Sequence, residues 1–370
     1  MRRVHGRAAG KTRASSFENL YRAYVAARKG KRGRAEVAAF TFNLEDELFA
    51  LQDELRAFTY APGAYRSFVV HEPKRRLISA APFRDRVVHH ALVQVIEPLF
   101  ERRFIFGSYA NRKGRGTHAA LDRFTYFARR FRYALPCDVR EFFPSIDHAI
   151  LRGQLARVIR DEPTLWLCDR ILESGAGVLA GEYTPVYFPG DDLLAACRPR
   201  GLPIGNLTSQ FWANVYLDPL DQFVKRQLRC QAYLRYVDDF ALFSDDKREL
   251  AAWRAAAIER AAALRLTLHD GSMPRVQARP VREGITFLGF GVFPDHRRLN
   301  SRRGHYARRH LRMLAAEVSA GRLPPARLSA SVLGWAAHAA HGDTYRLRCA
   351  VLSLETRFFA ENRFLRRCFG

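Results

Sequence analysis

The chain has 370 residues, 48% of them hydrophobic, and a formal net charge of +24 at pH 7. This length permits two or three domains or subdomains with a buried core, and the charge favours nucleic acid as a partner. Because there is no run of about 18 apolar residues and no signal-peptide pattern, we expect a cytoplasmic protein without a membrane partner.

The positive charge concentrates at the two ends of the chain. Residues 1–35 contain eleven Lys and Arg and one acid, and residues 297–370 contain fifteen Arg and four acids. We expect the first thirteen or so residues to be disordered, since they are small, basic and aperiodic. The C-terminal segment places Arg among aromatic and aliphatic residues at helical spacing, which predicts basic helices. The scattered cysteines argue against a zinc ribbon or a disulfide framework.

Hydrophobic periodicity predicts helices and strands in irregular order. Asn43 is a candidate N-cap for a helix over 44–58. The remaining predicted elements, in chain order, are two strands over 67–80 with a turn at 72–75, helices over 84–100 and 117–131, a strand over 133–139, a loop over 187–201, helices over 207–228 and 251–266, and a strand or hairpin over 284–293. This irregular alternation favours an α+β fold with a mostly antiparallel sheet.

The stretch YLRYVDDFALF, Tyr233 to Phe243, places Asp238 and Asp239 inside an aromatic and aliphatic run. The flanks predict two short strands around a turn, although the turn lacks the Gly or Asn that tight hairpins prefer. An ordinary Asp-rich turn is one interpretation. The other is a metal site, because crowded carboxylates repel and a bound Mg²⁺ removes that repulsion.

A metal site of this kind needs a third carboxylate, and Asp138 in LPCDVREFFPSID is the candidate. It ends an apolar strand, and it is either a helix-starting Asp or a partner of Asp238 on a neighbouring strand. Three such carboxylates could hold two Mg²⁺ ions for phosphoryl transfer. Two other Asp pairs are interpreted as structural: PGDDL (189–193) as a surface turn, and FSDDKREL (243–250) as helix capping.

At this point the chain resembles the reverse transcriptases. Tyr236–Asp239 resembles their tyrosine-x-Asp-Asp box, and CDVREFF (137–143) resembles their first catalytic motif. GLPIGNLTSQ (201–210) resembles the motif that shapes the nucleotide pocket. EPKRRLISA (72–80) is similar to the finger strands that hold the triphosphate, and GITFLGF (284–290) to the primer grip. The five motifs follow in the family's order over roughly residues 65–295.

The resemblance implies a right-hand polymerase with fingers, an antiparallel palm sheet and a helical thumb. It divides the chain into a basic N-terminal extension and helix (1–60), fingers and palm (61–295) and a basic helical thumb (296–370).

The implied catalytic residues are Asp138, Asp238 and Asp239, which with Val139 are also the implied ligands of two Mg²⁺ ions. The implied nucleotide-binding residues are Lys74, Arg75, Arg76, Phe143, Ile204, Gly205 and Gln210, with Phe143 as the gate against a ribose 2′-OH. The implied primer grip is Phe287, Leu288 and Gly289.

Within the family, the chain is most similar to the reverse transcriptases of diversity-generating retroelements. Ile204–Gly205 and Ser209–Gln210 carry this likeness, since most relatives have Gln before that Gly and Pro after that Ser. FGSYANRKGRGTHAAL (106–121) and the short C-terminus also fit. The chain departs at Thr267, near the place where many relatives carry a Lys that can protonate pyrophosphate; Arg265 or His269 could substitute.

We therefore expect an enzyme that copies a template-repeat RNA into error-prone cDNA. Its expected partners are template RNA, an RNA/DNA hybrid, dNTPs and a small basic helical-bundle accessory protein. The alternatives are a stand-alone bacterial reverse transcriptase in phage defence and a catalytically inactive RNA-binding protein; a group II intron maturase is less favoured, because no further domain follows. No RNase H domain is expected either, and HAAH (338–341) is interpreted as helix packing rather than a metal pair.

Overall fold

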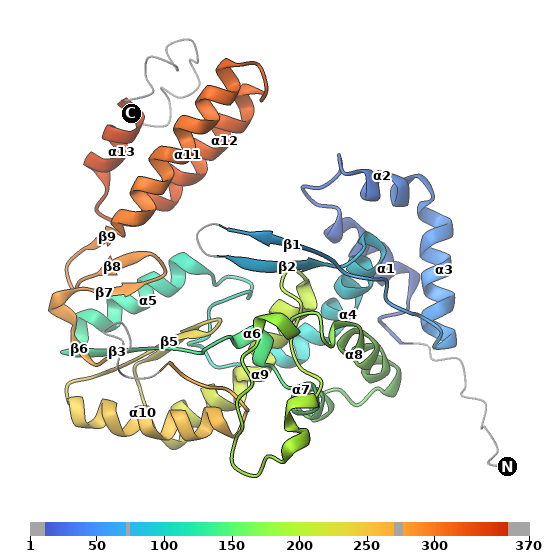
Figure 1. The fold of residues 1–370 in the computed structure, drawn as a ribbon, viewed down its shortest axis with the longest axis horizontal. Helices are drawn as coiled ribbons and strands as arrows, with labels where there is room; N and C mark the ends of the chain where they lie inside the picture. The colour runs from blue at the N-terminus through green and yellow to red at the C-terminus, as the bar shows by residue number, and fades with distance from the viewer. Residues whose placement is uncertain (1–11, 72–74, 270–276, 354–370) are drawn as a thin grey trace. The chain divides into compact units, whose positions relative to one another are not determined.

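The computed structural model describes residues 12–71, 75–269 and 277–353. The chain divides into two compact units: the first comprises Met1–Lys113, Cys137–Phe240 and Ala252–Asp270, and the second Gly114–Pro136, Ala241–Ala251 and Gly271–Gly370. Both contain helices and short strands (Figure 1). The strand pairs β1–β2, β3–β6, β7–β8 and β8–β9 are all antiparallel, so the predicted α+β class with antiparallel sheets is confirmed.

The first unit begins with helices α1 (Phe17–Ala27), α2 (Ala35–Phe42) and α3 (Leu44–Ala57), and α1 packs against α4 (Phe83–Glu101). Ser16 caps α1, because its hydroxyl accepts a hydrogen bond from the Asn19 amide. Asn43 precedes α3 as predicted, yet its side chain makes no capping hydrogen bond. That part of the prediction is wrong; three acidic residues in the first turn still favour the helix start.

A two-stranded hairpin follows, formed by β1 (Arg66–Val70) and β2 (Arg76–Ala80). Both predicted strands are confirmed, and residues 72–74 of the intervening turn lie outside the described residues. Every residue of β1 is exposed, while Ser79 of β2 is buried. The hairpin is therefore anchored through β2.

The core of the first unit surrounds α9 (Leu207–Gln222), which packs on α4 and on α7 (His148–Ala156). Trp212 and Tyr216 of α9 are almost fully buried. A π-helical turn, Phe223–Gln227, continues α9, so the predicted helix over 207–228 changes its hydrogen-bond pattern near its end. The other helices here are α6 (Phe142–Ser145), α8 (Glu162–Gly175) and α10 (Lys247–Ala262).

A four-stranded sheet has the strand order β4-β5-β3-β6. Its strands are β3 (Tyr133–Asp138), β4 (Tyr233–Tyr236), β5 (Asp239–Ser244) and β6 (Arg279–Pro280). Residues 240–244 of β5 are buried, as the apolar run in the sequence predicts for a central strand. The sheet thus places a buried strand directly after the Asp238–Asp239 pair.

The second unit contains α5 (Thr117–Arg130), a small sheet of β7 (Ile285–Phe287), β8 (Phe290–Val292) and β9 (Arg297–Leu299), and three C-terminal helices. These are α11 (Ser301–Ser319), α12 (Pro325–Ala339) and α13 (Tyr345–Ser353), and they lie together in Figure 1. Their shared core includes Leu311, Leu328, Val332 and Val351. Within residues 12–71, 75–269 and 277–353, no helix is both long and apolar enough to span a bilayer.

Candidate functional site

Asp238 and Asp239 lie at the tip of the hairpin that β4 and β5 form. Val237 and Asp238 make the turn, and Asp239 begins β5 with an exposed side chain. Val237 has a φ of +58°, a conformation that a β-branched residue rarely adopts. It costs about 1–2 kcal/mol relative to ordinary backbone, which explains why Gly or Asn is usually found in such turns. The turn is therefore held by contacts from elsewhere.

Asp138 is placed beside this turn by the arrangement of β3 and β5, which are neighbours in the sheet. At the far end of these strands, the Arg132 main-chain amide donates a 2.8 Å hydrogen bond to Asp245 Oδ1. The start of β3 therefore lies next to the end of β5, and the two strands run antiparallel. Both strands contain six residues, so this arrangement brings the end of β3, with Asp138, to the same edge of the sheet as the start of β5, with Asp239.

The chain around Asp138 is fixed by a second segment, residues 267–269. The His269 amide donates to the Asp138 carbonyl at 3.0 Å, and the Arg140 amide donates to the Thr267 carbonyl at 2.8 Å. Asp138 and Arg140 thus direct their main-chain groups toward this segment. Since neighbouring residues of an extended chain point their carbonyls to opposite edges, the Val139 carbonyl faces the other edge.

The alternating direction of the main-chain carbonyls along β3 identifies that edge. The Arg132 carbonyl accepts a hydrogen bond from the Val281 amide, which directly follows β6, and Asp138 lies six residues later with the same orientation. The Val139 carbonyl therefore faces the β5 edge, the edge that leads to Asp238 and Asp239. Carboxylate and carbonyl oxygens are the ligands that Mg²⁺ prefers, so this donor set fits the predicted metal.

The side chains themselves do not form a closed cluster. Among the residues that the structure describes, no group of three or more His, Cys, Asp or Glu side chains is arranged to hold a metal ion. His269 Nε2 lies 3.7 Å from Asp138 Oδ2, and these side chains are 22% and 21% exposed, respectively. The metal site with Asp138, Val139, Asp238 and Asp239 stays a prediction.

The turn is supported by Arg235, a residue that the sequence analysis did not single out. Its side chain is fully buried and forms an ion pair with the equally buried Asp221 of α9, with Nη2 and Oδ2 2.7 Å apart. Arg235 Nη1 also donates to the Val237 carbonyl at 2.9 Å. A hydrogen bond from a charged donor contributes about 1.5–3 kcal/mol, enough to offset the strain at Val237. The available signal was an Arg inside an otherwise apolar strand.

The predicted nucleotide pocket is assembled from three separate segments. The Leu202 amide donates to the Phe143 carbonyl at 3.0 Å, and the Ser79 amide donates to the Ile204 carbonyl at 2.8 Å. The half-buried Phe143 ring packs against Phe142, which is 2% exposed and belongs to the core. The motif 201–210 therefore contacts both the predicted gate and strand β2.

Gly205 lies where this motif meets β2. Its φ is +118°, and a Cβ there would lie 3.0 Å from Ile78 Cγ2. Asn206 locks the same junction, since its side chain donates to the Ser79 carbonyl at 2.8 Å and accepts from the Ala81 amide at 3.1 Å. Ile204 is half-buried and Gln210 is exposed.

The basic residues of the β1–β2 hairpin are placed less completely. Arg76 begins β2 and is exposed. Arg75 Nη1 lies 2.9 Å from both carboxylate oxygens of Glu182, in the segment between α8 and α9. Lys74 lies outside the described residues. Their predicted contact with a triphosphate stays a prediction.

The predicted primer grip forms the turn between β7 and β8 in the second unit. Phe287 ends β7, and Leu288 and Gly289 follow with φ of +48° and +89°. A Cβ on Gly289 would lie 2.2 Å from the guanidinium of Arg303, a flexible side chain that can move aside, so glycine is favoured here by its backbone conformation. The hairpin is confirmed, and its role in primer binding stays a prediction.

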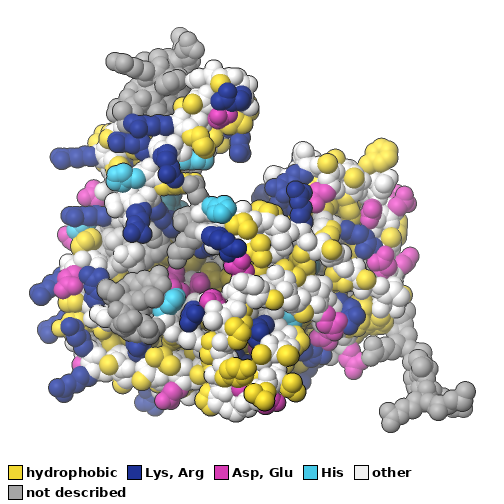
Figure 2. Space-filling model, in the orientation of Figure 1, with side chains coloured by type: hydrophobic (Ala, Val, Ile, Leu, Met, Phe, Trp, Pro, Cys, Tyr) yellow, Lys and Arg dark blue, Asp and Glu magenta, His cyan; other side chains and the backbone are white. Residues whose placement is uncertain are grey.

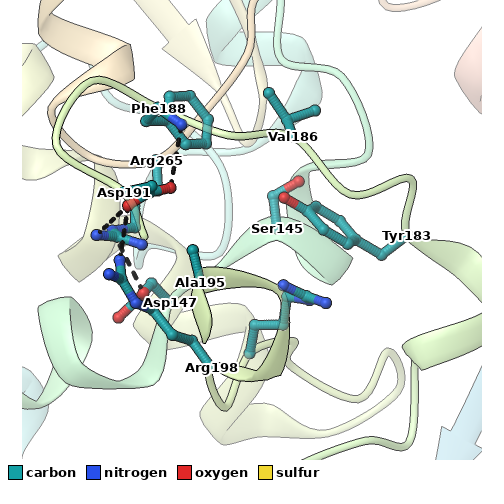
Figure 3. Close-up of a pocket in the computed structure, with 10 residues that line it drawn as sticks. Ser145, Asp147, Tyr183, Val186, Phe188, Asp191, Ala195, Arg198 and Arg265 are labelled. Carbon is teal, nitrogen blue, oxygen red and sulfur yellow. Dashed lines mark hydrogen bonds and ion pairs between the residues drawn. The ribbon is translucent and has the colours of Figure 1, made fainter. Parts of the chain in front are cut away.

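The prediction that PGDDL is a surface turn is wrong for Asp191. Its side chain is only 2% exposed and forms ion pairs with Arg198 and Arg265, at 2.9 and 2.7 Å. Figure 3 shows Asp191 directed toward both guanidinium groups. Arg265 also lies 3.6 Å from Asp147. Because Arg265 precedes the 267–269 segment, Asp191 helps to fix the chain that pairs with Asp138.

The C-terminal helices carry the basic surface that the sequence predicts. Figure 2 shows Lys and Arg side chains gathered over the C-terminal helices. Arg302, Arg303, Arg309 and Arg312 of α11 are exposed. In the HAAH stretch, His341 stacks on His118 of α5 with ring centroids 3.4 Å apart. Burial lowers the pKa of His118 and of His338, which suits packed, neutral imidazoles.

Comparison with known protein families assigns this chain to a class of enzymes, the RNA-dependent DNA polymerases. Residues 71–292 match the family model described as reverse transcriptase (RNA-dependent DNA polymerase). The chain belongs to the reverse transcriptase family and is an RNA-directed DNA polymerase. Enzymes of this family use divalent metal ions, template RNA and dNTPs.

Three curated relatives show how far the likeness extends. Protein YkfC of Escherichia coli K12 is 25% identical over 285 residues, which cover 66% of this chain and 70% of YkfC. The group II intron-encoded protein LtrA of Lactococcus lactis is 27% identical over 213 residues, 56% of this chain but only 33% of LtrA. Nuclear intron maturase 1 of Arabidopsis thaliana is 31% identical over 101 residues, 27% of this chain and 14% of the maturase.

Among solved structures, apo telomerase from Candida tropicalis truncated from its C-terminal domain is similar with a TM-score of 0.44. The sequences are 11% identical, and the match covers 64% of this chain and 55% of the telomerase chain.

Proposed function

We propose that this chain is the reverse transcriptase of a diversity-generating retroelement, and that it copies a template-repeat RNA into error-prone cDNA. The observation that carries this proposal is the motif GLPIGNLTSQ, which has Ile204 before the glycine and Gln210 after the serine. Ile204 is hydrogen-bonded to β2 and adjoins the predicted nucleotide pocket. FGSYANRKGRGTHAAL (106–121) supports the same subgroup by resemblance.

The proposed mechanism is phosphoryl transfer at the ends of β3 and β5. Asp138, Asp238, Asp239 and the Val139 carbonyl would hold two Mg²⁺ ions. When bound, these ions supply activation of the primer hydroxyl and neutralisation of leaving-group charge. The protein's own contribution is to position the carboxylates: β3 is fixed by the 267–269 segment, and the Asp238 turn is fixed by Arg235.

The proposed nucleotide pocket combines Lys74, Arg75, Arg76, Phe143, Ile204, Gly205 and Gln210. Phe143 would exclude a ribose 2′-OH by occupying its space, which is discrimination by a built clash. Ile204 offers hydrocarbon where a Gln would offer hydrogen bonds. A pocket with one hydrogen bond fewer distinguishes correct from incorrect nucleotides less well, by about tenfold for 1.4 kcal/mol.

The proposed organisation follows the family's right hand, with residues 1–60 as extension, 61–295 as fingers and palm, and 296–370 as thumb. Phe287, Leu288 and Gly289 would hold the primer strand, and the arginines of α11 would contact the RNA/DNA hybrid. A small basic helical-bundle protein is the proposed accessory partner.

Sequencing the RNA that copurifies with the protein from its host tests the proposal. A template nearly identical to a neighbouring gene, with cDNA that differs from it mainly at adenines, is the expected result. Recovery of a structured RNA unrelated to any neighbouring gene would instead indicate a stand-alone or defence role.

A substitution at Ile204 tests the same proposal at the level of the pocket. Ile204→Gln should lower misincorporation severalfold on a defined RNA while elongation persists. Leu207→Gln, at another half-buried position in the same motif, is the matched control and should leave the error spectrum unchanged. An unchanged spectrum for Ile204→Gln would place fidelity elsewhere.

The second candidate is an intron-encoded reverse transcriptase. The comparisons favour it, because LtrA and nuclear intron maturase 1 are named as intron proteins. An intron RNA in the copurified fraction would select this candidate over the retroelement.

A further inference from the structure

The turn that carries Asp238 depends on one buried guanidinium. Arg235 directs all five of its N–H groups to acceptors: Nε to Asp221, Nη1 to Asn214 and Val237, and Nη2 to Ser108 and Asp221, at distances between 2.7 and 3.2 Å. Five is the full donor capacity of an arginine. Val237 lies two residues away, but Asp221, Asn214 and Ser108 lie 14, 21 and 127 residues away in the chain, so the side chain joins distant segments to the hairpin.

Arg235 joins two other segments to the hairpin, α9 and the stretch around Ser108. Asp221 and Asn214 belong to α9, and Ser108 belongs to the FGSYA stretch, which pairs with β4 through a parallel bridge to Arg235. Gly107 is required there, because a Cβ would lie 2.7 Å from the Tyr233 carbonyl. The Tyr233 hydroxyl donates to Asp221 at 2.6 Å and completes the network.

We infer that Arg235 is a positioning residue for the polymerase reaction, which acts by holding the Val237 peptide and so orienting Asp238 and Asp239. The Val237 carbonyl is the atom of the turn through which Arg235 reaches the hairpin tip, at 2.9 Å. Val237 occupies a strained, left-handed conformation, and the neighbouring carboxylates are the proposed metal ligands. This inference rests on the proposed role of Asp238 and Asp239.

The network specifies arginine and not merely a positive charge. A lysine has three donors on one nitrogen, so it cannot reach the Asp221 carboxylate, Asn214, Ser108 and the Val237 carbonyl together. Arg235→Lys should therefore lower kcat at least tenfold at a fixed Mg²⁺ concentration. The KM for dNTP should change less than twofold, because Arg235 does not contribute to the predicted nucleotide pocket.

A charge-balanced double variant separates positioning from folding. Removing Arg235 alone leaves the buried Asp221 uncompensated, which can unfold the protein. Arg235→Met with Asp221→Asn removes both charges and retains an acceptor for the Tyr233 hydroxyl. We expect this variant to keep a cooperative thermal transition, to lose at least tenfold in kcat, and to require severalfold more Mg²⁺ for half-maximal activity. Arg152→Met with Asp169→Asn, which removes the 2.6 Å pair between α7 and α8, is the matched control and should leave the Mg²⁺ requirement unchanged.

Val237→Gly supplies an independent test, which also applies if Arg235→Met with Asp221→Asn folds poorly. Glycine adopts a positive φ without strain, so the turn then needs less support. Adding Val237→Gly to Arg235→Lys should recover at least threefold in kcat and lower the Mg²⁺ requirement. The inference would be overturned if Arg235→Met with Asp221→Asn kept the wild-type kcat and Mg²⁺ requirement. It would also be overturned if Val237→Gly did not raise the kcat of Arg235→Lys. If Asp238→Asn itself retained synthesis, the proposed site would fail first, so the two failures are distinguishable.

Discussion

Among single residues, Asp238 bears most directly on the proposed chemistry. Asp238→Asn removes one charge from the turn between β4 and β5 and changes little volume. Loss of a metal ligand should lower the rate of DNA synthesis by more than about a hundredfold, while RNA binding persists. Primer extension measures this, and Asp138→Asn should behave alike. Synthesis within tenfold of wild type would contradict the assignment. Asp245→Asn is the control, because an Asn oxygen can still accept the Arg132 amide.

Phe143 sets the proposed discrimination against ribonucleotides. Phe143→Ala should admit GTP, since the half-buried ring would no longer fill the space of a 2′-OH. The preference for dGTP over GTP should fall by about 10–100-fold, the range that shape discrimination supplies. Competitive incorporation of the two nucleotides measures it. Phe142→Leu is the control, because Phe142 is a core residue whose loss should reduce stability and leave the preference intact. An unchanged ratio for Phe143→Ala would assign that ring to packing as well.

Asp191 is now expected to matter for stability, contrary to what its Pro- and Gly-rich surroundings suggest. Asp191→Asn leaves Arg198 and Arg265 without their shared carboxylate and should cost about 1–3 kcal/mol in the free energy of unfolding. Urea denaturation measures this cost. The neighbouring Asp192 is 68% exposed, and Asp192→Asn should leave the urea midpoint unchanged. Equal midpoints for the two variants would show that the ion pairs contribute nothing.

The placement of Asp138 at the end of a strand, and of Asp238 and Asp239 at the turn of a hairpin, was predictable from sequence, whereas the contacts that support this turn were not. Asp138 stands out as a charge at the end of an apolar strand, and Asp238 as a charge within an aromatic and aliphatic run. The turn is supported by Arg235, whose side chain is held by Ser108 and Asp221, residues distant from it in the sequence. The pattern of a single sequence does not reveal such long-range pairs. The positive φ of Val237 was hidden for the same reason, since local preference argues against it and only tertiary contacts permit it.

At the scale of elements, helix α4 contains a buried histidine that should make the stability of the fold depend on pH. Its His89 is fully buried, and neither ring nitrogen has a hydrogen-bond partner among the residues that the structure describes. Burial, together with smaller contributions from the neighbouring His90 and Arg86, lowers the pKa of His89 to about 3. The unfolded chain binds a proton near the ordinary value of 6.5, so stability is complete above that pH and falls as pH drops toward 3.

Acid unfolding tests this dependence on pH. Wild-type protein should lose about 2 kcal/mol between pH 7 and pH 5 through His89 alone, at about 1.4 kcal/mol per pH unit below 6.5. His89→Leu removes the titrating group, so its stability should depend less on pH over this window. His305→Leu, at an exposed position on α11, is the control and should follow the wild-type profile. Parallel profiles for wild type and His89→Leu would exclude His89 as the cause.

The elements themselves were predicted best where periodicity was long or bounded by turn residues. Strands β1, β2, β4 and β5 and helices α4 and α5 lie within a residue or two of their predicted ranges. Helix α10 begins four residues earlier than predicted, since Asp245 and Asp246 precede it and favour its start. The loop over 187–201 contains the short 3₁₀ helix Leu193–Cys197, which its Pro and Gly content did not suggest.

For the whole molecule, the charge of +24 implies a phosphate-dominated interface with RNA. The logarithm of the RNA affinity should fall linearly with the logarithm of salt concentration, with a slope steeper than about −3 for five or more neutralised phosphates of a single strand. Fluorescence anisotropy with a labelled RNA measures this slope. A flat dependence would refute the interface.

The same measurement of RNA affinity against salt concentration tests whether α11 forms part of the RNA-binding surface. Arg308→Gln with Arg312→Gln should make the slope shallower by about 1.4, because each phosphate contact contributes about 0.7. Arg170→Gln with Arg279→Gln removes the same charge from arginines that pair with Glu173 and Glu283, and this control should change the slope by less than half as much. Equal changes in both variants would mean that RNA responds to total charge and not to α11. A selective change would assign α11 to the nucleic-acid surface, independently of which RNA the protein copies.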